Sequence, residues 1–181
     1  MDSHKIVFTG SGGQGLITIA ILLGEAAVLH EGLEAIQSQS YGAAARGGAT
    51  RSDVIISKKR INIPKAFQPG VLICLTQEAY NTYSSIIRPG GLLITDKRFV
   101  KVARKVDARQ VELDLYQAVL EKIGTPVVFN ISVLGALLGM KPMVKKESIL
   151  QVLAERFPPS FAKSNTLALE LGYELGSAHE V

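Results

Sequence analysis

The hydrophobic pattern of this 181-residue chain alternates short apolar runs with longer segments of helical character. Runs at residues 5–9, 33–37, 49–57, 71–76 and 92–95 have the length and composition of strands. Segments at residues 14–29, 77–87, 115–123, 125–139, 145–157 and 161–175 predict helices, several of them bounded by Gly or Pro. Residues 99–112 are basic and compatible with a further strand. Strands that alternate with helices indicate an α/β fold built on a mostly parallel sheet.

Four details refine this prediction. The charged turn at residues 58–60 predicts a hairpin, in which residues 61–63 return along the strand at 49–57 as a short antiparallel edge and make the sheet mixed. The strand at 33–37 is expected to run parallel to the strand at 5–9 after a right-handed crossover. The helix at 14–29 is apolar on nearly every face, which predicts burial on more than one side. Gly135, Ala136 and Gly139 permit close helix packing.

The composition fits one globular domain over residues 1–181, with 47% hydrophobic and 20% charged residues. No apolar run approaches the length needed to cross a membrane. The first residues carry no secretory signal pattern, so a cytoplasmic location is expected. Cys74 is the single cysteine, and its apolar surroundings predict a buried, inert thiol. One cysteine cannot hold an iron–sulfur cluster, and the three scattered histidines lack metal-ligand spacing.

The net charge of +4 is unevenly distributed along the chain. Residues 58–109 contain eleven Lys or Arg and three acidic residues, whereas residues 147–181 contain two basic and five acidic residues. The basic stretch is either a solvated face or a surface for an anionic ligand or an acidic partner. Nucleic acid is disfavoured as a partner, because no basic motif interleaved with aromatic residues is present.

The first candidate site is the glycine turn between the strand at 5–9 and the helix at 14–29. Gly10, Gly12 and Gly15 match G-x-G-x-x-G, and a helix N-terminus after such a turn can bind a phosphate or carboxylate. The amide of Gln14 could hydrogen-bond a ligand. A dinucleotide site also needs an acid at the end of the second strand, but Glu34 lies at its start, which disfavours a nicotinamide enzyme. A tight turn without a ligand is the alternative.

The second candidate site is the small, glycine-bearing loop at residues 38–48, which also follows a strand and is expected at the same edge of the sheet. Arg46, flanked by Gly47 and Gly48, could bind a phosphate or a partner's carboxylate through both guanidinium nitrogens. The alternative is a surface arginine beside a β-bulge. No Ser–His–Asp, Cys–His, metal or paired-carboxylate arrangement can be assembled from the sequence. The chain therefore has the character of a binding module or a subunit.

Together these motifs resemble the gamma subunit, or gamma domain, of 2-oxoacid:ferredoxin oxidoreductases. The resemblance covers essentially the whole chain, and the pairing of GGQG with YGxxxRGG is its most specific part. The motifs, in order, are Gly12-Gly13-Gln14-Gly15, Gln39-Ser40-Tyr41-Gly42 with Arg46-Gly47-Gly48, the hairpin at 52–63, Pro89-Gly90-Gly91-Leu92-Leu93-Ile94, Asn130, Leu134-Gly135-Ala136, Asn165, Ala168 and Gly172-Tyr173. One departure is Pro69-Gly70, where many members carry an acid.

The resemblance implies a three-layer α/β/α, Rossmann-like fold. It implies a complex that oxidatively decarboxylates a 2-oxoacid to its acyl-CoA and passes the electrons to ferredoxin. Thiamine diphosphate, Mg and [4Fe-4S] clusters would then sit on partner subunits, namely alpha and beta and in some enzymes delta. This chain would contribute no catalytic residue and would bind no cofactor stably by itself. It would help to receive coenzyme A, and the residues expected to do so are Gly12, Gly13, Gln14, Gly15, Tyr41, Arg46, Gly47 and Gly48.

The chain length and the Gln-Ser-Tyr-Gly sequence most resemble 2-oxoglutarate enzymes. The 2-oxoisovalerate, pyruvate and indolepyruvate branches stay open, because the substrate contacts are expected on the thiamine-bearing subunits. A free-standing nucleotide-binding module is the alternative from another functional class.

Overall fold

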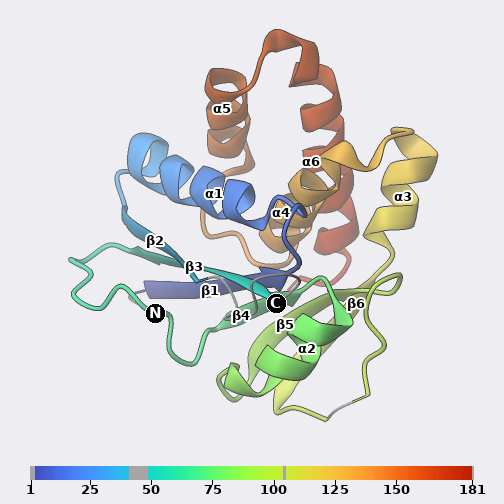
Figure 1. Ribbon diagram of the computed structural model, residues 1–181. Helices are drawn as coiled ribbons and strands as arrows, with labels where there is room; N and C mark the ends of the chain where they lie inside the picture. The colour runs from blue at the N-terminus through green and yellow to red at the C-terminus, as the bar shows by residue number, and fades with distance from the viewer. Residues whose placement is uncertain (1–2, 41–48, 104, 181) are drawn as a thin grey trace.

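A computed structural model describes residues 3–40, 49–103 and 105–180 (Figure 1). Within these residues one sheet forms in the order β2-β3-β1-β4-β5-β6. Its strands are β1 (Ser3–Gly10), β2 (Glu34–Ser40), β3 (Thr50–Ser57), β4 (Val71–Cys74), β5 (Gly91–Asp96) and β6 (Ala108–Leu113). The helices are α1 (Leu16–Glu31), α2 (Gln77–Tyr83), α3 (Leu115–Lys122), α4 (Phe129–Met140), α5 (Lys146–Arg156) and α6 (Ala162–Ser177).

The sheet is mixed, as predicted, but the antiparallel strand is not at the expected place. Strands β1, β4, β5 and β6 are mutually parallel, whereas β3 lies between β1 and β2 and is antiparallel to both. Strand β2 therefore runs in the same direction as β1, as predicted, without pairing with it. The connection through α1 skips one position in the sheet, and β3 fills that position.

The prediction of a strand at 61–63 is wrong. Both edges of β3 already pair with other strands, so the returning chain finds no free edge there. The chain instead crosses one face of the sheet and is held by Asp53 of β3. The carboxylate of Asp53 accepts hydrogen bonds from Arg51 Nε at 2.6 Å and from the Ala66 amide at 3.0 Å, which ties this segment to the sheet.

Helices cover the two faces of the sheet unequally, and the three-layer prediction is confirmed. Figure 1 shows α1, α3, α4 and α6 over one face and α2 over the other. Alternate residues of β1 enter the two cores, with Ile6 and Phe8 packed beneath the larger helical layer and Val7 packed beneath α2. The smaller core also holds Tyr80 and the predicted buried Cys74.

Helix α1 is buried on two sides, as its uniform apolar character predicts. One side packs on the sheet, and the other contacts α5, where Arg156 Nη1 lies 2.7 Å from Glu25 Oε1. The positive φ of 64° at Gly32 ends the helix in the left-handed conformation. Despite the hydrophobicity of α1, none of the helices in the described part of the chain is long and apolar enough to cross a bilayer.

Three predicted elements differ in detail from the observed ones. The helix predicted at 77–87 consists of α2 followed by the short 3-10 helix Ser84–Ile86. The helix predicted at 125–139 opens with the 3-10 turn Pro126–Val128, where Thr125 Oγ1 accepts a hydrogen bond from the Val127 amide, before α4 begins. The β-compatible stretch at 99–112 forms a strand only at β6.

Glu31 at the end of α1 caps the start of α5. Its Oε1 accepts hydrogen bonds from Ser148 Oγ at 2.6 Å and from the Lys145 amide at 2.9 Å. The bond from Ser148, followed by that from Lys145, lowers the pKa of Glu31 below its ordinary value of 4.5. A carboxyl whose pKa is lower in the folded than in the unfolded chain stabilises the fold above its ordinary pKa and loses this effect in acid.

We expect Glu31→Gln to lower the free energy of unfolding by about 1 kcal/mol at neutral pH, as the loss of a helix cap does. The difference from the unsubstituted chain should shrink as the pH falls below 4.5, because the carboxylate is then protonated as well. Urea unfolding across this pH range measures both effects. Ser148→Ala is the matched partner variant, and a Glu31→Gln difference that does not change with pH would contradict the cap.

Candidate functional site

The glycine turn joins β1 to α1 and lies at the carboxyl end of β1. Gly13 and Gly15 have positive φ values of 86° and 70°, a conformation that favours glycine. A Cβ atom at Gly12 or Gly13 would meet nothing within 4 Å, so this side of the turn faces open space. The turn therefore presents bare backbone at the surface, and a phosphate or a partner chain can approach it closely.

Gln14 fastens the turn to the neighbouring strand. Its Oε1 accepts a hydrogen bond from the Ser11 amide at 2.8 Å, and its Nε2 donates to the carbonyl of Leu75, just beyond β4, at 3.0 Å. A Cβ atom at Gly10 would come within 3.0 Å of Gln14 Oε1, so glycine there makes room for the folded-back side chain. The structure thus gives Gln14 a positioning role, and a direct contact with a ligand stays a prediction.

Asn130 at the start of α4 supports the turn from the opposite side. Its Nδ2 donates to the carbonyl oxygen of Gly15 at 3.3 Å, and a Cβ atom at Gly15 would collide with the same amide group. The glycine pattern does not predict this contact, although Asn130 appears among the family motifs. The available signal is its position as one of two polar residues, with Ser132, inside an apolar helical segment.

The backbone amides at the N-terminus of α1 are the groups of the turn that could bind an anion. Gly15 caps the helix without a side-chain hydrogen bond, and the first turn contains no acidic residue. The first amides of a helix have no partners within the helix, and the helix dipole adds positive potential there. A phosphate or carboxylate placed against this turn would accept hydrogen bonds from the unpaired amides and would lie in the positive potential of the helix dipole.

Of the predicted site residues, Tyr41, Arg46, Gly47 and Gly48 lie outside the described residues. The strands that flank this segment are described and locate both of its ends. Thr50 pairs with Gly10 at the end of β1, and Ser40 at the end of β2 pairs with Arg51. The chain therefore leaves and re-enters the sheet at the edge that carries the glycine turn, as the sequence predicts.

Two kinds of reactive site, an activated thiol and a metal cluster, can be checked in the part of the chain that the structure describes. Burial raises the pKa of the Cys74 thiol to about 12, although its hydrogen bond from Thr9 Oγ1 acts in the opposite direction. A thiol with this pKa stays protonated near neutral pH and is a poor nucleophile. Among the described residues, no group of three or more His, Cys, Asp or Glu side chains could hold a metal ion.

Comparison with known proteins places the whole chain in one family. Residues 5–175 match the model of the pyruvate ferredoxin/flavodoxin oxidoreductase family. The chain is 39% identical to the 2-oxoglutarate synthase subunit KorC of Methanocaldococcus jannaschii, over 94% of this chain and 92% of that protein. It is 30% identical to the pyruvate/ketoisovalerate oxidoreductases common subunit gamma of Thermococcus litoralis, over 98% and 99% of the two chains.

A solved structure agrees with these relatives. The gamma subunit of a keto/oxoacid ferredoxin oxidoreductase from Geobacter sulfurreducens superimposes with a TM-score of 0.90 at 34% identity, covering 100% of both chains. The likeness therefore extends over the whole fold. The chain belongs to the pyruvate ferredoxin/flavodoxin oxidoreductase family, as a gamma subunit of the 2-oxoacid:ferredoxin oxidoreductases.

Proposed function

We propose that this chain is the gamma subunit of a complex that oxidatively decarboxylates 2-oxoglutarate to succinyl-CoA and passes the electrons to ferredoxin. The observation that carries this proposal is the 39% identity, along nearly the whole of both chains, to a subunit named for 2-oxoglutarate synthase. The chain contributes a scaffold and a binding surface. Thiamine diphosphate, Mg and the iron–sulfur clusters belong to alpha and beta partners, with delta as a further partner.

The choice of 2-oxoacid lies with the partner subunits in this proposal. The Thermococcus relative is, by its name, common to a pyruvate and a ketoisovalerate oxidoreductase, which supports a gamma subunit that does not select the acid. The open surface of the glycine turn, with Gly12 and Gly13 uncovered, also suits a docking surface better than a pocket for a small acid. Activity of the assembled complex toward 2-oxoglutarate, pyruvate, 2-oxoisovalerate and indolepyruvate decides between the branches.

The glycine turn and the loop that carries Arg46 form the coenzyme A contact in this proposal. Two chemical features support it. The amides at the start of α1 favour an anion, and the register of β3 brings both ends of the 41–48 segment to the same edge of the sheet. The phosphates of coenzyme A are suitable anions for both groups, and Tyr41, Gly47 and Gly48 accompany Arg46 in this assignment.

We expect the purified chain alone to show no 2-oxoglutarate oxidation with coenzyme A and ferredoxin, because this proposal assigns the thiamine diphosphate and the iron–sulfur clusters to the partner subunits. Tagged protein recovered from its native cells should co-purify with its partner chains, and this preparation should oxidise 2-oxoglutarate. Mass spectrometry identifies those chains, and an electron-acceptor assay compares the two preparations. Turnover by the isolated chain, or tight binding of NAD to it in calorimetry, would overturn the proposal.

A further inference from the structure

The chain between β3 and β4 crosses the same face of the sheet as α2, and we call residues 58–67 the crossing segment. It forms neither helix nor strand, but side chains of the sheet fix its position. The Ile61 amide donates a hydrogen bond to Glu34 Oε2 at 3.1 Å. Ser38 Oγ donates to the carbonyl of Pro64 at 3.0 Å. With the hydrogen bond to the β3 carboxylate, these contacts hold the segment along its length, so its outer surface has a defined shape.

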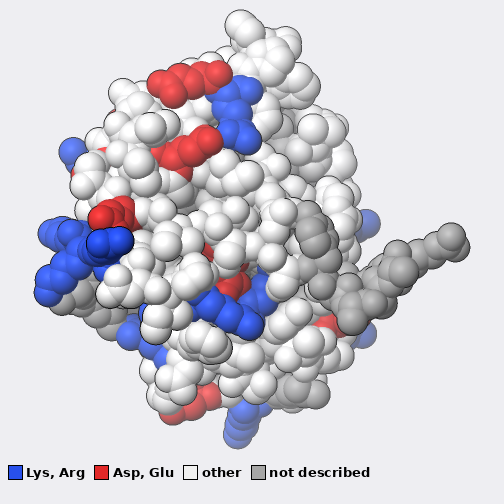
Figure 2. Space-filling view, turned by 60° about the vertical axis from the view of Figure 1, so that its left-hand side comes forward, with Lys and Arg blue, Asp and Glu red and all other residues white. Residues whose placement is uncertain are grey.

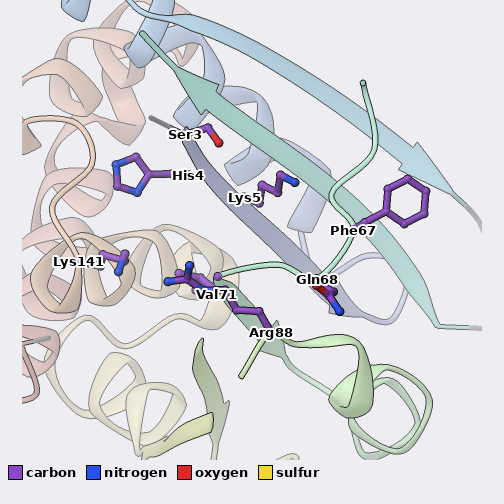
Figure 3. A pocket seen from close by; sticks show the side chains of 9 residues that line it. Ser3, His4, Lys5, Phe67, Gln68, Val71, Arg88 and Lys141 are labelled. Carbon is purple, nitrogen blue, oxygen red and sulfur yellow. The ribbon is translucent and has the colours of Figure 1, made fainter. Parts of the chain in front are cut away.

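The outer surface of the crossing segment is both apolar and basic. Ile63 and Phe67 are large apolar residues, yet they are 62% and 59% exposed. Figure 3 shows the Phe67 ring turned away from Gln68 and Arg88. Lys65 Nζ lies 5.6 Å from the centroid of the Phe67 ring, so a positive charge adjoins the apolar surface.

The crossing segment carries no acidic residue and four basic ones, which are Lys58, Lys59, Arg60 and Lys65. Figure 1 shows this part of the chain at the left-hand side, beyond the end of β3. The space-filling view brings that side forward and shows Lys and Arg gathered on it (Figure 2). A surface with positive charges around an apolar centre is complementary to a surface with carboxylates around an apolar side chain.

A hollow of about 260 Å³ lies between the crossing segment and the strands β1 and β3. Buried Ile55 of β3 lines it together with Ile63 and Phe67. Lys5 brings positive charge to its wall, because its position two residues before Val7 on β1 places its side chain on the α2 face. No acidic side chain of the described residues lines the hollow. Its volume lies below the range of about 300–1,000 Å³ for small-molecule sites, so it suits a side chain of a docked protein better than a cofactor.

We propose that the crossing segment is a docking surface for a partner subunit of the oxidoreductase, whose contact region places Asp or Glu residues around an apolar side chain. The apolar side chain enters the hollow beside Ile63 and Phe67, and the carboxylates contact Arg60 and Lys65. An apolar anchor inside a polar rim is the usual arrangement of a stable protein–protein interface. The inference rests on membership of a family of multi-subunit enzymes and not on the choice of 2-oxoacid.

A second copy of this chain is a poorer occupant than a different subunit. A two-fold symmetric contact through this surface would bring the same cations of both copies together, and like charges repel. A copy could instead present the acidic residues Glu170 and Glu174 of α6, but such a contact is not self-complementary and would continue into a ring or a filament. Ferredoxin is also a poorer occupant, because transient electron-transfer contacts are small, whereas exposed large apolar residues are typical of permanent interfaces.

The test replaces Ile63 or Phe67 with the photo-crosslinking residue p-benzoylphenylalanine and purifies the complex of the full-length chain with its partners. We expect irradiation to join both positions to one partner subunit, at a peptide richer in Asp and Glu than in Lys and Arg. Leu167 is 43% exposed on α6, and the same replacement there should not reach that peptide. Cross-links that reach only a second copy, added ferredoxin or added anionic lipid vesicles would overturn the proposal, as would the absence of any cross-link to another chain.

Matched variants separate this surface from general surface charge. Arg60→Glu with Lys65→Glu should weaken association with the partner subunits at least about tenfold, because like charges across an interface repel, and the effect should shrink in high salt. Lys97→Glu with Lys163→Glu makes the same charge change at exposed positions elsewhere and should leave association unchanged. Equal association of the two double variants would contradict the docking surface.

The apolar part of the surface is tested by a second pair of variants. Ile63→Ser with Phe67→Ser should weaken association in low and high salt alike, whereas Val28→Ser with Leu29→Ser, at exposed positions of α1, should not. Surface plasmon resonance measures association, and circular dichroism checks the fold. Because the readout is association, a complex that prefers another 2-oxoacid would refute the proposed substrate without affecting this inference. Association that Ile63→Ser with Phe67→Ser leaves unchanged would overturn the apolar anchor and with it the proposal.

Discussion

Replacing Gly172 with alanine is expected to destabilise the fold of this chain strongly. Gly172 lies in α6 against α4, and an added Cβ atom would come closer than 3.0 Å to the backbone of both Ser132 and Ala136. Backbone atoms cannot rotate away as the end of a side chain can, so the two helices must separate. We expect a loss of at least about 3 kcal/mol, the upper range for overpacking a core, against a total stability of about 5–15 kcal/mol.

Chemical unfolding followed by circular dichroism measures the effect, and α1 offers a matched control. Gly24 is also a helical glycine, but a Cβ atom there would lie 3.9 Å from the Ala35 Cβ, an ordinary contact. Gly24→Ala should therefore stabilise the chain by about 0.5–1 kcal/mol, because alanine is the better helix former. If Gly172→Ala unfolded at the same denaturant concentration as the unsubstituted chain, the close packing of α4 and α6 would be wrong.

Glycines on both helices form the contact between α4 and α6. Helix α4 also contacts the candidate site. Gly135 and Gly139 on α4 face the backbone of α6, while Gly172 and Gly176 on α6 face the backbone of α4. Close approach of the two helices fixes the position of α4 relative to the sheet. The first turn of α4 carries Asn130, which donates to the carbonyl of Gly15 in the glycine turn. Loosening this helix pair is therefore expected to disturb the turn as well as the core.

Local patterns in the sequence were sufficient to predict most of the elements. The glycine turn is marked by glycines that adopt positive φ, and the close helix packing by Gly135 and Gly139. The buried, inert state of Cys74 follows from the apolar strand around it. In each case the physical cause acts within a few residues, so the sequence alone carries the signal.

Features that depend on distant partners could not be predicted in this way. The central place of β3 depends on pairing with both β1 and β2, so the hairpin predicted at 61–63 was wrong. The Gln14 amide donates to the carbonyl of Leu75, and the Asn130 amide donates to the carbonyl of Gly15. No local rule relates positions so far apart in the chain, and only the tertiary structure brings them together.

Gly13→Val is expected to lower turnover of the assembled oxidoreductase at least about tenfold, a typical scale for a small misplacement of a binding group. Gly13 has a φ of 86°, and a β-branched residue in that region costs about 1–3 kcal/mol. Because the added side chain would meet open space, the chain should still fold and the strain should fall on the turn itself. The amides at the start of α1 would then shift away from the group that they bind.

The matched control for this prediction is Gly12→Val, which adds the same bulk to the same open surface at a residue without positive φ. If geometry at the turn is what matters, Gly13→Val should impair turnover and Gly12→Val should impair it less. If the turn contacts coenzyme A, the loss in Gly13→Val should include a raised KM for coenzyme A while the KM for 2-oxoglutarate stays constant.

Size exclusion checks that both variants still assemble, because a failure to dock would also lower turnover. Assembled complexes of both variants with unchanged turnover and unchanged KM would remove the glycine turn from the functional surface.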